Sequence, residues 1–196
     1  MPSATKAKAA IVILISGRGS NMKSIVEAVK SGSLDVTVAA VISNRPDAAG
    51  LLYAQQQNIP TAAIDHTQFE SRQSFDHAMA KKIDHYSPKL VVLAGFMRIL
   101  TTEFVEHFAG KLINIHPALL PKFKGLNTHQ RAIDAGEKEH GASVHIVTAE
   151  LDDGPVVLQA RVAVLEGDTE QTLAARVLEQ EHTLYPKAIA QLIAEN

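Results

Sequence analysis

An asparagine and a histidine stand two positions apart at the end of a short apolar run, residues 112–115. Alternate residues of a β-strand project from the same face, so we expect Asn114 and His116 to point in one direction. The first offers an amide donor and the second a titratable imidazole. Such a pair can hold a carbonyl group while its oxygen becomes negative. The competing interpretation is a histidine that only caps a strand end.

Two carboxylates, Asp152 and Asp153, stand in a segment that continues with Gly154 and Pro155 and is typical of a turn. Aspartate is common in exposed turns because its side chain bonds to nearby backbone. The functional interpretation requires one carboxylate to reach His116, orient its ring and favour its charged form. The sequence leaves both interpretations open.

A glycine-rich segment, residues 16–21 (Ser-Gly-Arg-Gly-Ser-Asn), follows the first apolar run. Its glycines allow close backbone approach, and the amides at the start of the next helix can bind an anion. The third glycine of the dinucleotide fingerprint is replaced by Met22, and no Gly-Lys-Ser/Thr follows. We therefore expect one phosphate group, not NAD or ATP; a plain strand-to-helix turn is the alternative.

A second loop, residues 95–100 (Gly-Phe-Met-Arg-Ile-Leu), follows a predicted buried strand. Ligands of open α/β folds bind at the carboxyl ends of the strands. The loop is apolar apart from Arg98, so it can form walls for a flat heteroaromatic ring. By composition alone, the better interpretation is that its apolar side chains anchor the following helix in the core.

Composition restricts the class of protein. The chain has 196 residues, a formal net charge of −2 and no cysteine. It therefore offers no strong field for nucleic acid or an anionic membrane, and no disulfide, thiolate nucleophile or cysteine zinc site. The histidines other than His116 lack zinc-ligand spacing, so we expect no metal and assign them surface or packing roles. The apolar runs are too short to span a bilayer.

Strand-like and helical patterns alternate along the chain, which predicts an α/β protein with a mainly parallel, twisted sheet flanked by helices. Two late strands joined by the acidic turn predict an antiparallel addition at one edge. We expect a flexible leader over residues 1–8 and a single domain over 9–196. The predicted strands are 9–15, 36–42, 89–94, 112–115, 142–148 and 156–164. The predicted helices are 21–29, 48–57, 69–86, 101–108, 128–135 and 169–194, the last kinked at Pro186.

Taken together, these motifs resemble the phosphoribosylglycinamide formyltransferases, the folate-dependent GAR transformylases of purine synthesis. The resemblance extends from Ile11 to Tyr185. The matching segments are residues 16–21, 95–100, 114–121 with Gly125, 140–145, 151–155 and 180–182. Each segment is a weak signal, but six in this order are specific.

The resemblance implies a Rossmann-like formyltransferase fold, a cytoplasmic monomer or homodimer, and two small-molecule substrates. The formyl group of 10-formyltetrahydrofolate would pass to the amine of 5′-phosphoribosylglycinamide (GAR), without metal, nucleic acid or membrane. Asn114 and His116 would stabilise the oxyanion, and Asp152 would tune His116. The GAR site would contain Gly19, Ser20, Asn21 and Glu181, and the folate site Arg72, Met97, Arg98, Ile99, Leu100 and Asn114. Arg18 stands at a variable position of the family and could add a phosphate contact; Asp153 replaces a frequent glycine.

Three alternatives remain open. A formyltetrahydrofolate deformylase would use the same Asn–His–Asp set with water as acceptor, but that family usually has an N-terminal regulatory domain, and the first predicted strand here begins near residue 9. A methionyl-tRNA formyltransferase usually adds a C-terminal tRNA-binding domain. A non-catalytic folate or nucleotide binding module would not need Asn114, His116 and Asp152.

Overall fold

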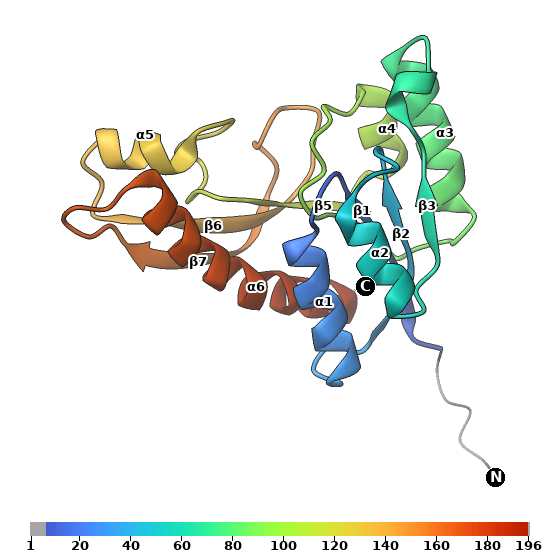
Figure 1. Ribbon diagram of the computed structural model, residues 1–196, viewed down its shortest axis with the longest axis horizontal. Coiled ribbons are helices and arrows are strands. Elements are labelled where there is room, and N and C mark those ends of the chain that lie inside the picture. Colours follow the sequence, from blue (N-terminus) through green and yellow to red (C-terminus); the bar gives the residue numbers. More distant parts are fainter. Residues whose placement is uncertain (1–6, 196) are drawn as a thin grey trace.

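The computed structural model describes residues 7–195, whose strands form one seven-stranded sheet in the order β3-β2-β1-β4-β5-β6-β7 (Figure 1). The first five strands in this order pair in parallel, whereas β5 with β6 and β6 with β7 pair antiparallel. The predicted fold class, a mainly parallel α/β sheet with an antiparallel edge late in the chain, is confirmed. Of the predicted leader, residues 1–6 lie outside the described residues, and the single domain stays a prediction.

The observed elements follow the predicted ranges closely. The strands are β1 (Ala9–Ile15), β2 (Val36–Ser43), β3 (Thr61–Ala63), β4 (Leu90–Leu93), β5 (Leu112–His116), β6 (Glu139–Ile146) and β7 (Val156–Ala163). The helices are α1 (Ser20–Lys30), α2 (Ala49–Gln56), α3 (Arg72–Asp84), α4 (Thr102–His107), α5 (Thr128–Asp134) and α6 (Glu170–Glu195), with a 3-10 turn at His66–Gln68. None of these helices is both long and apolar enough to cross a membrane.

Helices cover both faces of the parallel part of the sheet, which explains why its central strands β1 and β4 are apolar throughout. Ile11, Ile13 and Ile15 of β1 join a core cluster with α1, α2 and α6. Val12 and Leu14, which alternate with them, join a second cluster with α3 and α4. All five side chains are fully buried. The strand therefore has no polar face, in contrast to an exposed β-ribbon.

Three details differ from the sequence prediction. β3 was not predicted, because three residues at the sheet edge carry too little pattern. α3 begins at Arg72 rather than Phe69, because Ser71 and Ser74 form a capping box that sets the first turn. The third difference is small: α6 spans Glu170–Glu195 with Pro186 inside it, close to the predicted 169–194, and the predicted kink stays a prediction.

The loops that follow β1, β2, β4 and β5 emerge at one edge of the sheet, where the parallel strands have their carboxyl ends. A buried tyrosine from α6 fixes two of these strands. The hydroxyl of Tyr185 lies 2.7 Å from the carbonyl oxygen of Leu93 in β4 and 3.2 Å from that of Ile113 in β5. The last helix thus helps to set the edge on which the candidate site is built.

Candidate active site

Four polar side chains meet where the parallel and antiparallel parts of the sheet join. Asn114 and His145 face each other in the β5–β6 register, with 3.3 Å between Nδ2 and Nε2. Asp152 lies between two histidines: its Oδ2 is 3.4 Å from His116 Nδ1, and its Oδ1 is 3.7 Å from His145 Nε2. The side chains of His116, His145 and Asp152 are at least nine-tenths buried. We call these four residues the polar cluster.

The orientation of His116 follows from its partners. Its Nε2 lies 2.9 Å from the carbonyl oxygen of Phe123, which can only accept, so Nε2 carries a proton. Its Nδ1 faces the carboxylate of Asp152. Both ring nitrogens therefore face oxygen acceptors, a setting that suits an imidazolium, in which both nitrogens donate.

His145 takes the opposite role. Its Nδ1 lies 3.1 Å from the carbonyl oxygen of Ile146 and so donates to it, which leaves Nε2 of the neutral ring as an acceptor for the Asn114 amide. Burial lowers the pKa of His145, against smaller opposing effects of the Ile146 bond and the Asp152 charge. A neutral His145 thus fixes the amide of Asn114 and leaves its second N–H free.

The turn that carries Asp152 is fastened to a neighbouring loop and to β6. The backbone N–H of Gly125 donates to Asp152 Oδ2 at 2.9 Å, and Lys124 forms an ion pair with Asp153. Gly154 lies so close to β6 that a Cβ there would stand 1.7 Å from the carbonyl oxygen of Ile146. The predicted reach of one aspartate to His116 is therefore observed, and the other aspartate is engaged with a lysine.

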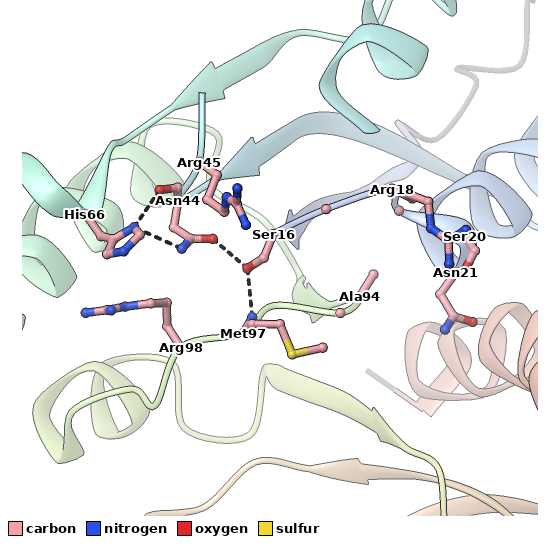
Figure 2. Close-up of a pocket in the computed structure, with 13 residues that line it drawn as sticks. Ser16, Arg18, Ser20, Asn21, Asn44, Arg45, His66, Ala94, Met97 and Arg98 are labelled. Carbon is pink, nitrogen blue, oxygen red and sulfur yellow. Dashed lines mark hydrogen bonds between the residues drawn. The ribbon is translucent and has the colours of Figure 1, made fainter. Parts of the chain in front are cut away.

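The glycine loop after β1 lines one part of a cleft of about 520 Å³ (Figure 2). Gly19 has a left-handed backbone with φ 69° and precedes α1, whose first turn contains no acidic residue. Asn21 is buried; its Nδ2 donates to Glu181 Oε2 at 2.7 Å, whereas its Oδ1 has no partner in the protein. Burial raises the pKa of Glu181, against the opposing effect of the Asn21 bond.

The loop after β4 divides its side chains between core and surface. Phe96 and Leu100 pack against the second core cluster, as the anchoring interpretation predicts. Met97 and Ile99 are 76% and 66% exposed. Arg98 lines the cleft with Met97, its guanidinium carbon is 5.6 Å from the centre of the Phe75 ring, and its Nε is buried without a partner. The loop therefore presents two apolar side chains and one arginine.

The predicted site residues fall into three groups. The polar cluster contains Asn114, His116 and Asp152, and the cleft contains Gly19, Ser20, Asn21, Met97 and Arg98. Glu181 contacts Asn21 from α6. Arg72 is exposed at the start of α3 and is not among the residues that line this cleft, nor are Ile99 and Leu100. Within residues 7–195, no group of three or more histidine or acidic side chains is placed to hold a metal ion.

Comparison with known proteins decides the family. The formyl transferase model matches residues 9–189, nearly the whole chain. The chain belongs to the formyl transferase family. It is 53% identical over 180 residues to the phosphoribosylglycinamide formyltransferase of Escherichia coli K12, covering 92% of this chain and 85% of that protein. The resemblance read from the six segments is thereby confirmed.

Two further relatives agree with this assignment. The structure of the phosphoribosylglycinamide formyltransferase of Coxiella burnetii matches with a TM-score of 0.92 and 53% identity, over 96% of this chain and 88% of that one. The human trifunctional purine biosynthetic protein adenosine-3 is 42% identical over 189 residues, which are 96% of this chain and 19% of that protein. The fold and the enzyme class therefore rest on both sequence and structure.

Sequence reasoning missed one member of the polar cluster of this formyl transferase. His145 was assigned a surface or packing role, because its position in the sequence gave no link to Asn114. The link is the antiparallel register, which places His145 opposite Asn114. Residues 117–138, with α5, separate the two strands along the chain, and the sequence pattern does not reveal this register.

Proposed function

We propose that this formyl transferase moves the formyl group of 10-formyltetrahydrofolate to the amine of GAR, giving formyl-GAR and tetrahydrofolate in purine synthesis. The amine nitrogen attacks the formyl carbon and forms the new C–N bond. A tetrahedral oxyanion results. The bond to the folate nitrogen then breaks, and that nitrogen gains a proton as the amine loses one. No covalent enzyme intermediate is needed.

The observation that carries this proposal is that the polar cluster and the glycine loop lie at the same edge of the sheet, at the carboxyl ends of β5 and β1. Asn114 offers a free N–H and His116 a protonated Nε2, both suited to an oxyanion. By analogy with known oxyanion donors, each contributes about 2–4 kcal/mol to transition-state stabilisation. The carboxylate of Asp152, 3.4 Å from Nδ1, faces that nitrogen as an acceptor and fixes the orientation of the ring.

Phe123 limits when His116 can act. His116 Nδ1 faces Asp152, so the proton available to a substrate is the one on Nε2. In the structure, Nε2 donates its hydrogen bond to the carbonyl oxygen of Phe123. We infer that the formyl oxygen replaces this carbonyl as the acceptor when the donor binds. His116 can then pass the same proton to the departing nitrogen.

GAR binding is assigned to the glycine loop. The free amides at the start of α1 suit a phosphate, aided by the absence of acidic residues from the first turn of the helix. Asn21 Oδ1, buried and without a protein partner, and the neighbouring Glu181 suit hydroxyl groups of the ribose.

Folate binding is assigned to the loop after β4. Met97 and Ile99 offer exposed apolar surface next to the cleft, and Asn114 lies at the reacting end. Arg98 and Leu100 complete this site, and Arg72 offers a cation at its outer side for the carboxylates of the donor. Small molecules are the expected partners and the cytoplasm the expected location; a monomer or a homodimer stays an expectation.

The test mixes purified protein with 10-formyltetrahydrofolate and follows tetrahydrofolate release with and without GAR. We expect release that depends on GAR and yields formyl-GAR. Release at the same rate without GAR would contradict the transferase and identify a deformylase. Binding of the donor without release in either condition would leave only a binding module.

A further inference from the structure

A chain of hydrogen bonds joins four residues that line the cleft shared by the glycine loop and the loop after β4 (Figure 2). The Ser16 hydroxyl lies 2.7 Å from the backbone nitrogen of Met97 and 2.5 Å from Asn44 Oδ1. Asn44 in turn contacts His66, whose Nδ1 lies 2.9 Å from the Asn44 carbonyl oxygen. The chain joins the ends of β1 and β2 to the loop after β4.

The donors in this chain are determined by chemistry. The Met97 N–H can only donate, so the Ser16 oxygen accepts from it. Asn44 Oδ1 can only accept, so the single Ser16 proton points at Asn44. Ser16 and Asn44 are 6% and 2% exposed, so water cannot easily replace either bond. The Ser16 hydroxyl is therefore held in one orientation.

Ser16 holds the loop after β4 at two points. Its backbone N–H donates to the carbonyl oxygen of Gly95 at 3.2 Å, and its side chain accepts from Met97. Gly95 has φ 76°, a conformation that costs glycine little, and the neighbouring Phe96 packs against the second core cluster. The Met97 side chain is 76% exposed, so its own packing does not fix the Met97 backbone, whose N–H is held by Ser16.

We propose that Ser16 and Asn44 are positioning residues for the formyl donor: together they fix the backbone of Met97 and so the wall of the folate site. This inference rests on the proposed function and extends it to two residues of the cleft lining that it gives no substrate contact. Ser16 is also the first residue of the glycine loop and directly follows β1. The same residue therefore begins the loop of the GAR site and anchors the loop of the folate site.

The first experiment compares Ser16→Ala and Ser16→Thr. Loss of one hydrogen bond corresponds to about a tenfold change in an equilibrium constant. We expect Ser16→Ala to raise the KM of the donor and the Kd of tetrahydrofolate, measured by calorimetry, about tenfold, with less than a twofold change in the KM of GAR. Ser16→Thr keeps a hydroxyl and should recover most of the affinity. Ser31→Ala is the matched control, since Ser31 bonds only to local groups at the far end of α1.

The second experiment is a double-variant cycle with Asn44→Leu, which removes the acceptor of the Ser16 proton. If Asn44 acts by orienting Ser16, the Ser16→Ala/Asn44→Leu protein should bind tetrahydrofolate no more weakly than Ser16→Ala alone. Additive losses of tetrahydrofolate affinity in the double variant would show that Asn44 does not act by orienting Ser16. Equal rises in both KM values, or no recovery in Ser16→Thr, would overturn the positioning role.

Folding and function are controlled separately. Thermal unfolding of each variant shows whether it folds; should Ser16→Ala fail to fold, Asn44→Leu against wild type carries the same KM comparison. The calorimetric Kd requires no turnover, so a wild-type protein that binds tetrahydrofolate but ignores GAR would contradict the proposed function while this inference is still tested.

Discussion

At the scale of single residues, the two histidines of the polar cluster differ in their hydrogen-bond partners. His116 meets oxygen acceptors at both ring nitrogens, whereas buried His145 donates through one nitrogen and accepts through the other. One carboxylate, Asp152, lies near both. The chemistry proposed here therefore depends on which oxygen atoms surround each imidazole, not on the number of histidines.

The first prediction concerns His116. Replacing it by alanine removes an oxyanion donor and the proton source for the leaving nitrogen, so we expect kcat to fall by about a hundredfold or more. The KM of GAR should change little, since His116 is not placed in the GAR site. Steady-state kinetics check this, with His85→Ala on the surface as a matched control. Turnover near the wild-type rate would remove His116 from the mechanism.

The second prediction concerns Arg18, which lines the cleft beside the glycine loop (Figure 2). A guanidinium can bind phosphate through two parallel hydrogen bonds. Replacement by glutamine should raise the KM of GAR about tenfold and leave kcat and the donor KM nearly unchanged. The nucleoside form of GAR, which lacks the phosphate, serves as the control substrate. An equal effect of the variant on both substrates would show that Arg18 does not contact the phosphate.

At the scale of elements, the sequence predicted the buried strands from short continuous apolar runs and the helices from the spacing of their apolar residues. The helix at α1 was identified from apolar residues at positions 22, 25, 26 and 29; the first three are buried, and Val29 is half-buried against the same core cluster. The end of β5 was identified as a site because two chemically useful side chains share one face there. Asn44 and His66 were not identified as site residues from the sequence. Their contacts, Asn44 with Ser16 and His66 with Asn44, join segments that are distant in the sequence.

The turn between β6 and β7 gives a prediction at this scale. A methyl group at Gly154 would overlap the Ile146 carbonyl oxygen, so Gly154→Ala must move the turn away from β6 and Asp152 with it. We expect kcat to fall about tenfold or more, equivalent to at least 1.4 kcal/mol of transition-state stabilisation. Gly136→Ala is the control: it strains a left-handed turn (φ 67°), but its Cβ would meet nothing within 4 Å, so it adds backbone strain without displacing a neighbouring element. Equal kinetics of the two variants would show that the turn tolerates displacement.

At the scale of the whole molecule, acid should weaken the fold through buried histidines. Burial lowers the pKa of His140 to about 4, and the side chain is 1% exposed. The unfolded chain binds this proton below about pH 6.5, whereas the folded state does so only near pH 4. Stability is therefore present above pH 6.5 and is lost as the pH falls toward 4. Between pH 7.5 and 5 this one group should cost about 2 kcal/mol.

Chemical denaturation at the two pH values measures this loss. His140→Gln should show a smaller difference between pH 7.5 and 5 than wild type, by about 2 kcal/mol, whatever its absolute stability. The comparison of the two pH differences cancels titrating groups that do not contact His140; His129, 3.2 Å away, is the neighbour that also responds. Identical pH dependence in the two proteins would show that His140 titrates alike in both states.

Tyr185 and Glu181 give the last helix a consequence for synthesis of the chain. Translation proceeds from the N-terminus, so β1, β4 and β5 leave the ribosome long before α6 does. The hydroxyl that joins β4 to β5 and the carboxylate that holds Asn21 both emerge after every strand of the sheet. A nascent chain that ends before residue 181 contains His116, the proposed proton donor, but neither of these contacts. Translation that stalls within α6 would then yield polypeptides without activity, rather than partly active enzyme.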